Sequence, residues 1–288
     1  MKGDSLQQAE RECRRIALSH YENFLVASVL MPGRLKQPFY NVYAFCRTAD
    51  DLADGSATPQ QALRSLEQCQ ASLDATFAGR PPAGIFTALA ATIEQFQLEK
   101  QPFDDLLDAF RQDQRKRRYE TVDELLDYCR RSANPVGRIV LQLAAVDADR
   151  EALDRSDQIC TGLQLANFWQ DVARDHAIGR IYLPQSELRA SGISEDMVSE
   201  MVQQQSTPPV MKTVIEALCV RTQTYFDRGE PLCDHVPKWL GRNLRLFVGG
   251  GRATLAAIRA IDFDVLRVRP RVSKATQAGL ILRSLVGR

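Results

Sequence analysis

The stretch YAFCRTADDLAD, residues 43–54, ends a run of apolar residues at helical spacing with three carboxylates. Asp50 and Asp54 lie four residues apart, so they share one face of the predicted helix. Like charges at this spacing destabilise a helix, Asp is a poor helix former, and negative charge is unfavourable near a helix C-terminus. We therefore expect a bound cation to offset these costs.

A second acidic stretch, NFWQDVARD at residues 167–175, repeats the arrangement. Asn167, Asp171 and Asp175 recur at four-residue steps among mainly apolar neighbours. Oxygen ligands at this spacing suit Mg²⁺, which keeps several waters and bridges to substrate phosphates. If two such faces meet across a bundle, their metals would stabilise a diphosphate leaving group. Either acidic stretch alone could be an ordinary solvent-exposed helix end that binds no metal. The occurrence of two such stretches makes that interpretation less suitable.

The rest of the chain also favours helices, because apolar residues recur mostly at spacings of three and four and alternating β-patterns are short. Pro- and Gly-containing breaks separate the helical segments. The sequence therefore predicts an all-α fold in one domain, residues 1–288. The predicted helices are 5–18, 35–54, 59–78, 84–97, 103–118, 121–131, 135–147, 150–176, 194–204, 209–228, 237–260 and 272–286.

Composition excludes several classes of protein. The 288 residues include 37 Lys and Arg against 36 Asp and Glu, which argues against a dedicated nucleic-acid binder. The seven cysteines are scattered and form no CxxC pair, so neither a zinc site nor a disulfide framework is indicated. The first residues are polar, and no run approaches the roughly 18 apolar residues that span a bilayer. We expect a cytoplasmic protein.

Arginines near the acidic stretches are candidate diphosphate ligands. Arg47 lies one turn before Asp50, Arg174 lies inside the second stretch, and Arg180 follows shortly after it. The planar guanidinium group suits phosphate oxygens. For any single arginine, neutralisation of a nearby Asp is an equally good interpretation.

Two other stretches are less specific. The basic run at residues 115–118 is interpreted as a solvated face or as an edge near anionic ligands. The glycine triplet at 249–251 lies in a helical pattern without a Walker lysine, so it favours close helix packing. Arg252, which follows the triplet, is a candidate phosphate contact.

Taken in order, the motifs resemble those of the squalene/phytoene synthase family, whose helical fold carries two Asp-x-x-x-Asp motifs on facing helices. The resemblance implies an isoprenoid synthase-type bundle around a central cavity, with the four motif aspartates as catalytic metal ligands and with Asn167 and Gln170 supporting them. It covers nearly the whole chain. The matching segments are 20–24, 30–32, 43–54, 128–137, 163–175 and 182–184.

Finer features resemble one branch, the hydroxysqualene synthases of bacterial hopanoid pathways. These features are ENF at 22–24, VAS at 26–28, SANPVG at 132–137 and NFWQD at 167–171. The resemblance implies that presqualene diphosphate ionises, rearranges and is captured by water as an allylic cation, giving hydroxysqualene. It implies Mg²⁺ and no requirement for NADPH. The chain lacks a Rossmann fingerprint, but reductive squalene synthases lack one too, so this does not exclude reduction.

The resemblance also assigns roles to single residues. His20 falls in the segment that the family uses near the diphosphate. Tyr128 matches the family's catalytic tyrosine, which could relay a proton or face a carbocation, although periodicity alone favours a core aromatic residue. Asn134 departs from the eukaryotic squalene synthases, which have Gly there. Our hypothesis is that its amide helps to position the quenching water.

Other functions stay open. A condensing enzyme of the same family would join two farnesyl or two geranylgeranyl diphosphates. A chain-elongating prenyltransferase or terpene cyclase is a further candidate, because residues 50–54 also read as DDxxD. A helical assembly factor that has lost catalysis is a different class, and the intact acidic pairs argue against it.

The last segment, residues 267–288, mixes several basic residues with short apolar runs. It suits contact with the anionic inner face of a membrane, and it equally suits a basic final helix docked on the domain. We favour the second interpretation. The expected partners are an isoprenoid diphosphate and, in the hopanoid branch, other enzymes of that pathway.

Overall fold

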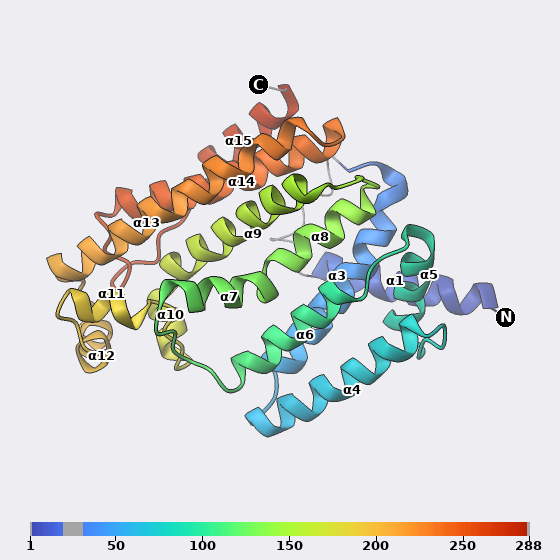
Figure 1. The fold of residues 1–288 in the computed structure, drawn as a ribbon, viewed down its shortest axis with the longest axis horizontal. Coiled ribbons are helices and arrows are strands. Elements are labelled where there is room, and N and C mark those ends of the chain that lie inside the picture. Colours follow the sequence, from blue (N-terminus) through green and yellow to red (C-terminus); the bar gives the residue numbers. More distant parts are fainter. Residues whose placement is uncertain (1, 20–30, 287–288) are drawn as a thin grey trace. The chain divides into compact units, whose positions relative to one another are not determined.

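The computed structural model describes residues 2–19 and 31–286, and its regular secondary structure there is helical (Figure 1). The described residues contain no strand beyond an isolated bridge between Arg118 and Ile181. The all-α prediction is therefore confirmed. None of the described helices is long and apolar enough to cross a membrane. The chain divides into two compact units, so the prediction of one domain over 1–288 stays a prediction.

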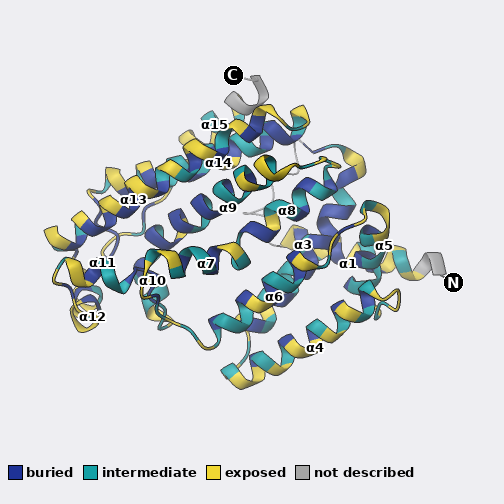
Figure 2. Ribbon diagram, viewed as in Figure 1, coloured by how far each residue is buried: buried dark blue, intermediate teal, exposed yellow. Residues whose placement is uncertain are grey.

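The first unit comprises Met1–Arg115, Pro135–Asp149 and Val236–Leu240. Its central element is α3, which contacts α1, α4, α5 and α6 and is largely buried along its length (Figure 2). Phe45 of α3 is fully buried and meets Phe103 edge-on, with ring centroids 5.4 Å apart. The helices of this unit are α1 (Lys2–Ser19), α3 (Gly33–Asp54), α4 (Pro59–Phe77), α5 (Ile85–Phe96), α6 (Gln101–Asp113) and most of α8 (Asn134–Leu143).

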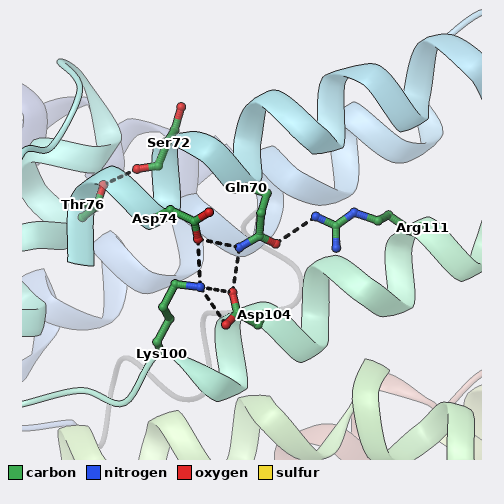
Figure 3. A network of polar contacts seen from close by, with 7 residues as sticks. All are labelled: Gln70, Ser72, Asp74, Thr76, Lys100, Asp104 and Arg111. Atoms are coloured by element: carbon green, nitrogen blue, oxygen red, sulfur yellow. Dashed lines mark hydrogen bonds and ion pairs between the residues drawn. The ribbon is translucent and has the colours of Figure 1, made fainter. Parts of the chain in front are cut away.

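A polar network ties α4 to the start of α6 at the surface of this unit (Figure 3). Lys100 donates to Asp74 at 2.8 Å and to Asp104 at 2.6 Å. Gln70 donates to both carboxylates and accepts from Arg111 at 2.8 Å. The ion pairs lower the pKa of Asp74 and outweigh desolvation at Lys100, whose pKa is raised. Each of these five side chains thus has a structural partner.

The second unit comprises Lys116–Asn134, Arg150–His235 and Gly241–Arg288. Its core is the pair α9 and α13, which pack closely because Gly162 of α9 lies against the ring of Phe226. Trp169 is buried and donates from its indole nitrogen to Thr222 at 2.8 Å. The helices are α7 (Val122–Ser132), α9 (Arg150–Gln170), α10 (Val172–Ala177), α11 (Gln185–Ala190), α12 (Glu195–Gln203), α13 (Pro209–Gly229), η1 (Glu230–Asp234), most of α14 (Lys238–Ala260) and α15 (Lys274–Val286).

The predicted helix boundaries need four corrections. The helix expected at 150–176 is interrupted at Asp171, whose φ of −109° and ψ of 16° are not helical. The helix expected at 103–118 ends at Asp113, because the amide of Ile181 bonds the carbonyl of Arg117 and draws that segment into a tertiary pairing. The helix expected at 135–147 ends at Leu143, and the short helix α11 was not predicted.

Glycines in α14 permit close packing, as the triplet suggested. A Cβ on Gly251 would lie 2.2 Å from Cζ of Phe226, and one on Gly249 would lie 2.7 Å from a methyl group of Leu280. A Cβ on the intervening Gly250 would meet nothing within 4 Å. Position 251 therefore requires glycine because the buried ring of Phe226 cannot move easily, whereas at Gly249 the end of the Leu280 side chain can shift and Gly250 is open.

This contrast gives a matched pair of variants. Gly251→Ala should lower the free energy of unfolding by about 1–3 kcal/mol, because a rigid buried ring must move. Gly250→Ala should leave it unchanged or raise it by up to about 1 kcal/mol, because alanine favours the helix. Urea denaturation of both variants tests this. Equal effects of the two substitutions would contradict the packing argument.

Candidate functional site

The first acidic stretch forms the last turn of α3, in the first unit. Nη1 of Arg47 lies 3.2 Å from Oδ2 of Asp50, and Nη2 pairs with Asp51. Asp50 is half-exposed and Asp54 is exposed. Nε of Arg47 is buried and has no hydrogen-bond partner in the described part of the chain. Arg47 thus neutralises the acidic turn and keeps one donor for another group.

The second acidic stretch lies where α9 gives way to α10, in the second unit. The amide of Asp171 bonds the carbonyl of Asn167 at 3.0 Å, and the amide of Asp175 bonds the carbonyl of Asp171 at 2.9 Å. Because these bonds keep four-residue spacing through the break, the three residues remain one turn apart. Asn167 is exposed, while Asp171 and Asp175 are partly buried. Their oxygen-only donor set suits a hard divalent cation.

Arg269 reaches the same carboxylates from the segment before α15. Its Nη2 donates to Oδ2 of Asp171 at 3.0 Å, and its Nε also pairs with this aspartate. Gln170 donates to the carbonyl of Pro270 at 2.8 Å, so it anchors this segment to the end of α9. Sequence reasoning missed Arg269 as a site residue. Its only sequence signal is the basic character of the last segment, about a hundred residues along the chain.

The electrostatics of Asp175 are unusual. Burial, followed by repulsion from Asp171, raises the pKa of Asp175 to about 7, against the attraction of Arg180, Arg174 and Arg269. Arg174 is mostly exposed and lies 3.7 Å from Asp171. The amide of Arg180 bonds the carbonyl of Asp175 at 2.8 Å. Burial and the neighbouring Asp171 therefore disfavour the ionised form of Asp175 despite three nearby arginines.

The basic run at 115–118 supports the loop after this site. Lys116 pairs with Glu124, and Arg118 pairs with Glu195. Nη1 of Arg118 donates to the carbonyl of Gly179 at 2.6 Å, in the turn between α10 and Ile181. Two of the four basic side chains therefore hold structure together, as opposed to forming a solvated face.

An aromatic cluster borders the second acidic stretch. Tyr182 stacks on Phe168, with centroids 3.9 Å apart and planes 13° apart. Tyr128 of α7 lies 6.0 Å from the ring of Tyr182 and 5.3 Å from that of Tyr119. All four rings are buried. Phe168 lies three residues before Asp171, about one helical turn away, so a π-system is close in the chain to the acidic pair and can stabilise positive charge there.

The remaining predicted residues have varied surroundings. Arg252 pairs with Asp227 at 2.7 Å and with Glu230 at 2.9 Å, and its Nε is buried without a hydrogen-bond partner in the described residues, so its phosphate contact stays a prediction. Asn134 is buried and accepts a hydrogen bond from the hydroxyl of Thr161 at 3.0 Å. His20 lies outside the described residues.

The second unit thus brings together Asn167, Asp171 and Asp175 with Arg174 and Arg180, and Tyr128 contacts Phe168 of the same helix α9. The first unit brings together Asp50, Asp54 and Arg47. Residues 2–19 and 31–286 contain no group of three or more His, Cys, Asp or Glu side chains that could hold a metal ion by themselves. Each acidic stretch instead offers a pair of carboxylates, which suits Mg²⁺ that also binds waters and phosphate oxygens. The meeting of the two acidic faces stays a prediction.

Comparison with known proteins gives consistent matches. A family model described as squalene/phytoene synthase matches residues 18–276. A crystal structure of the squalene synthase HpnC from Alicyclobacillus acidocaldarius is 41% identical, with a TM-score of 0.84 over 90% of this chain and 95% of that one. The 15-cis-phytoene synthase of Synechococcus elongatus is 30% identical over 93% of this chain and 89% of its own length. A dehydrosqualene synthase structure shares the fold, with a TM-score of 0.85 at 24% identity over 99% of this chain and 98% of that one.

The raised pKa of Asp175 predicts a pH dependence for the metal-free protein. The folded state keeps a proton that the unfolded chain loses near its ordinary pKa of about 4. Retention of this proton stabilises the folded state fully below about pH 4, the pKa of the unfolded chain. The stabilisation is lost as pH rises through about 7, the pKa of the folded state. From pH 5 to pH 8 in EDTA, the wild type should therefore lose stability relative to Asp175→Asn.

Urea denaturation at several pH values measures this difference. Asp196→Asn, at an exposed position in the first turn of α12, is the matched control and should follow the wild type. If the curves of the wild type and Asp175→Asn stay parallel, the proton is not retained by Asp175.

Proposed function

Because this chain belongs to the squalene/phytoene synthase family, we propose that it is a Mg²⁺-dependent enzyme that converts presqualene diphosphate to hydroxysqualene and diphosphate. The observation that carries the proposal is the second acidic site, in which a partly buried carboxylate pair lies beside a cluster of buried aromatic rings. Such a site combines an anchor for a metal diphosphate with an apolar wall for a cation. The 41% identity to a squalene synthase supports this substrate class.

Asp50, Asp54, Asp171 and Asp175 would hold the metal ions, with Asn167 as a further oxygen ligand. Bound Mg²⁺ supplies positive charge that stabilises the departing diphosphate. The high pKa of Asp175 fits this role, because a divalent cation would compensate the repulsion between Asp171 and Asp175.

Arginine side chains would complete the diphosphate site. Arg47 and Arg269 are paired with carboxylates in the structure, and both present guanidinium groups next to the acidic stretches. Arg174 is exposed beside Asp171 and is free to turn towards a phosphate. Arg180 adds charge next to Asp175. The guanidinium fork binds phosphate oxygens through two parallel hydrogen bonds.

The aromatic cluster would serve the carbocation stage. The rings of Tyr128, Phe168 and Tyr182 offer negative π-faces without a strong nucleophile, so a cation can rearrange before it is quenched. The phenol of Tyr128 would orient the cation or relay a proton. Capture by water requires no reductant, so NADPH is not part of the proposed reaction.

Head-to-head condensation of two farnesyl or geranylgeranyl diphosphates is the second candidate, because the relative at 30% identity is a phytoene synthase. Incubation of the purified protein with presqualene, farnesyl or geranylgeranyl diphosphate, each with and without NADPH, separates the two functions. Hydroxysqualene from presqualene diphosphate without NADPH is the expected product. If presqualene diphosphate stays intact while farnesyl diphosphate is consumed, the proposed reaction is wrong.

Asp171→Asn should reduce turnover about 100-fold or more, because it removes an anionic ligand from the site where negative charge develops. Binding of Mn²⁺, followed by electron paramagnetic resonance, should weaken at least about tenfold. Asp196→Asn should affect neither measurement. If Asp171→Asn binds Mn²⁺ as the wild type does, the metal assignment fails even if turnover falls.

Arg269→Gln should strengthen Mn²⁺ binding in the absence of diphosphate by roughly threefold, because the arginine competes for Asp171 from a partly exposed position. The same variant should bind inorganic diphosphate more weakly. Arg259→Gln, at an exposed position in the last turn of α14, is the control for a lost positive charge. Unchanged Mn²⁺ affinity in Arg269→Gln would contradict a metal site at Asp171.

A further inference from the structure

The end of α7 carries buried polar groups that the site described above does not use. Oγ of Ser132, the last residue of α7, is buried and has no hydrogen-bond partner in the described residues. Oε1 of Gln158, in α9, is likewise buried without a partner there. Unsatisfied buried polar atoms are rare in folded proteins because each costs about 1–3 kcal/mol. The unsatisfied hydroxyl of Ser132 at the junction of α7 and α8 indicates a binding place for a small polar molecule.

Asn134, the first residue of α8, lies two positions after Ser132 and is only 6% exposed. The hydroxyl of Thr161, also 6% exposed, donates to its Oδ1 at 3.0 Å. This bond restricts the orientation of the amide. Nowhere in the described ranges does an acceptor take a hydrogen bond from Nδ2 of Asn134. The amide therefore keeps an oriented donor for a ligand.

The junction of α7 and α8 and the aromatic cluster both lie where α7 packs against α9. Thr161, Leu165 and Phe168 recur at helical spacing on one face of α9, and the ring of Phe168 lies 6.2 Å from that of Tyr128 in α7. Thr161 lies two turns from Phe168, a rise of about 10 Å. Gln158 is one turn further on the same face. One face of α9 therefore carries polar residues at 158 and 161 and apolar residues at 165 and 168.

We propose that Ser132 and Asn134 bind the water molecule that captures the carbocation, and that Thr161 is a positioning residue that orients the amide of Asn134. This inference rests on the proposed function and names the residues that determine whether the cation is captured by water. Water has two donors and two acceptors, so one molecule satisfies both Oγ of Ser132 and Nδ2 of Asn134. Thr161 suits its role because a β-branched side chain has few rotamers in a helix.

The step balances without an added reagent. The bond between carbon and the diphosphate oxygen breaks, and the electron pair leaves with the diphosphate. After rearrangement, an oxygen lone pair of the water forms a new bond to the allylic carbon. The resulting oxonium group loses one proton, which the released diphosphate anion accepts. When water is badly placed, the cation instead loses a proton from an adjacent carbon and gives an alkene.

The experiment measures how the products divide between alcohol and alkene, normalised to the diphosphate released. Thr161→Val keeps the shape of the side chain but removes the hydroxyl, so the ratio of hydroxysqualene to alkene should fall roughly fivefold, the equivalent of one hydrogen bond. Thr161→Ser should restore the ratio. Ser132→Ala should lower it in the same direction. Thr213→Val, at an exposed position near the start of α13, is the control.

Labelled water identifies the oxygen. In H₂¹⁸O the alcohol from the wild type should carry one ¹⁸O atom. If Thr161→Val gives the wild-type ratio, or if Thr161→Ser fails to restore it, the inference is wrong while the proposed function stands. If the wild type releases no hydroxysqualene from presqualene diphosphate, the proposed function itself is wrong.

Discussion

Repulsion between carboxylates at the ends of two helices is the constraint on which the candidate site depends. In both acidic stretches an arginine lies against the aspartates: Arg47 beside Asp50, and Arg269 beside Asp171. Even so, Asp175 keeps a pKa near 7, since burial and its neighbour disfavour the ionised form. A divalent cation beside Asp171 and Asp175 would favour the ionised form of both carboxylates. The proposed metal site rests on these carboxylates, and the proposed diphosphate site on the arginines beside them.

The surrounding structure keeps the second acidic stretch in place. Gln170 anchors the segment that carries Arg269, and Arg118 holds the turn after Asp175 by its bond to Gly179. On the other side, the stacked rings of Phe168 and Tyr182 exclude water. Polar anchoring on one side and aromatic packing on the other give a site with two chemical environments. An amphiphilic substrate with a charged head and a long hydrocarbon tail needs both.

The polar groups at the junction of α7 and α8 fit this division. A water molecule free to move through the aromatic cluster would quench the cation before it rearranges. One held by Ser132 and Asn134 stands about two helical turns from Phe168, at a fixed position. Placement of a nucleophile, as distinct from its mere presence, then decides which product forms.

The sequence by itself determined the helical class, most helix positions, and both acidic stretches, because these depend on spacing within one helix. Four-residue steps put Asp171 and Asp175 one turn apart whatever surrounds them. Tertiary structure decided the rest. The break at Asp171, the end of α6 at Asp113 and the pairing of Arg269 with Asp171 arise from contacts between segments far apart in the chain. Local periodicity carries no information about such contacts, since their energy comes from burial and ion pairs that form only when the chain has folded.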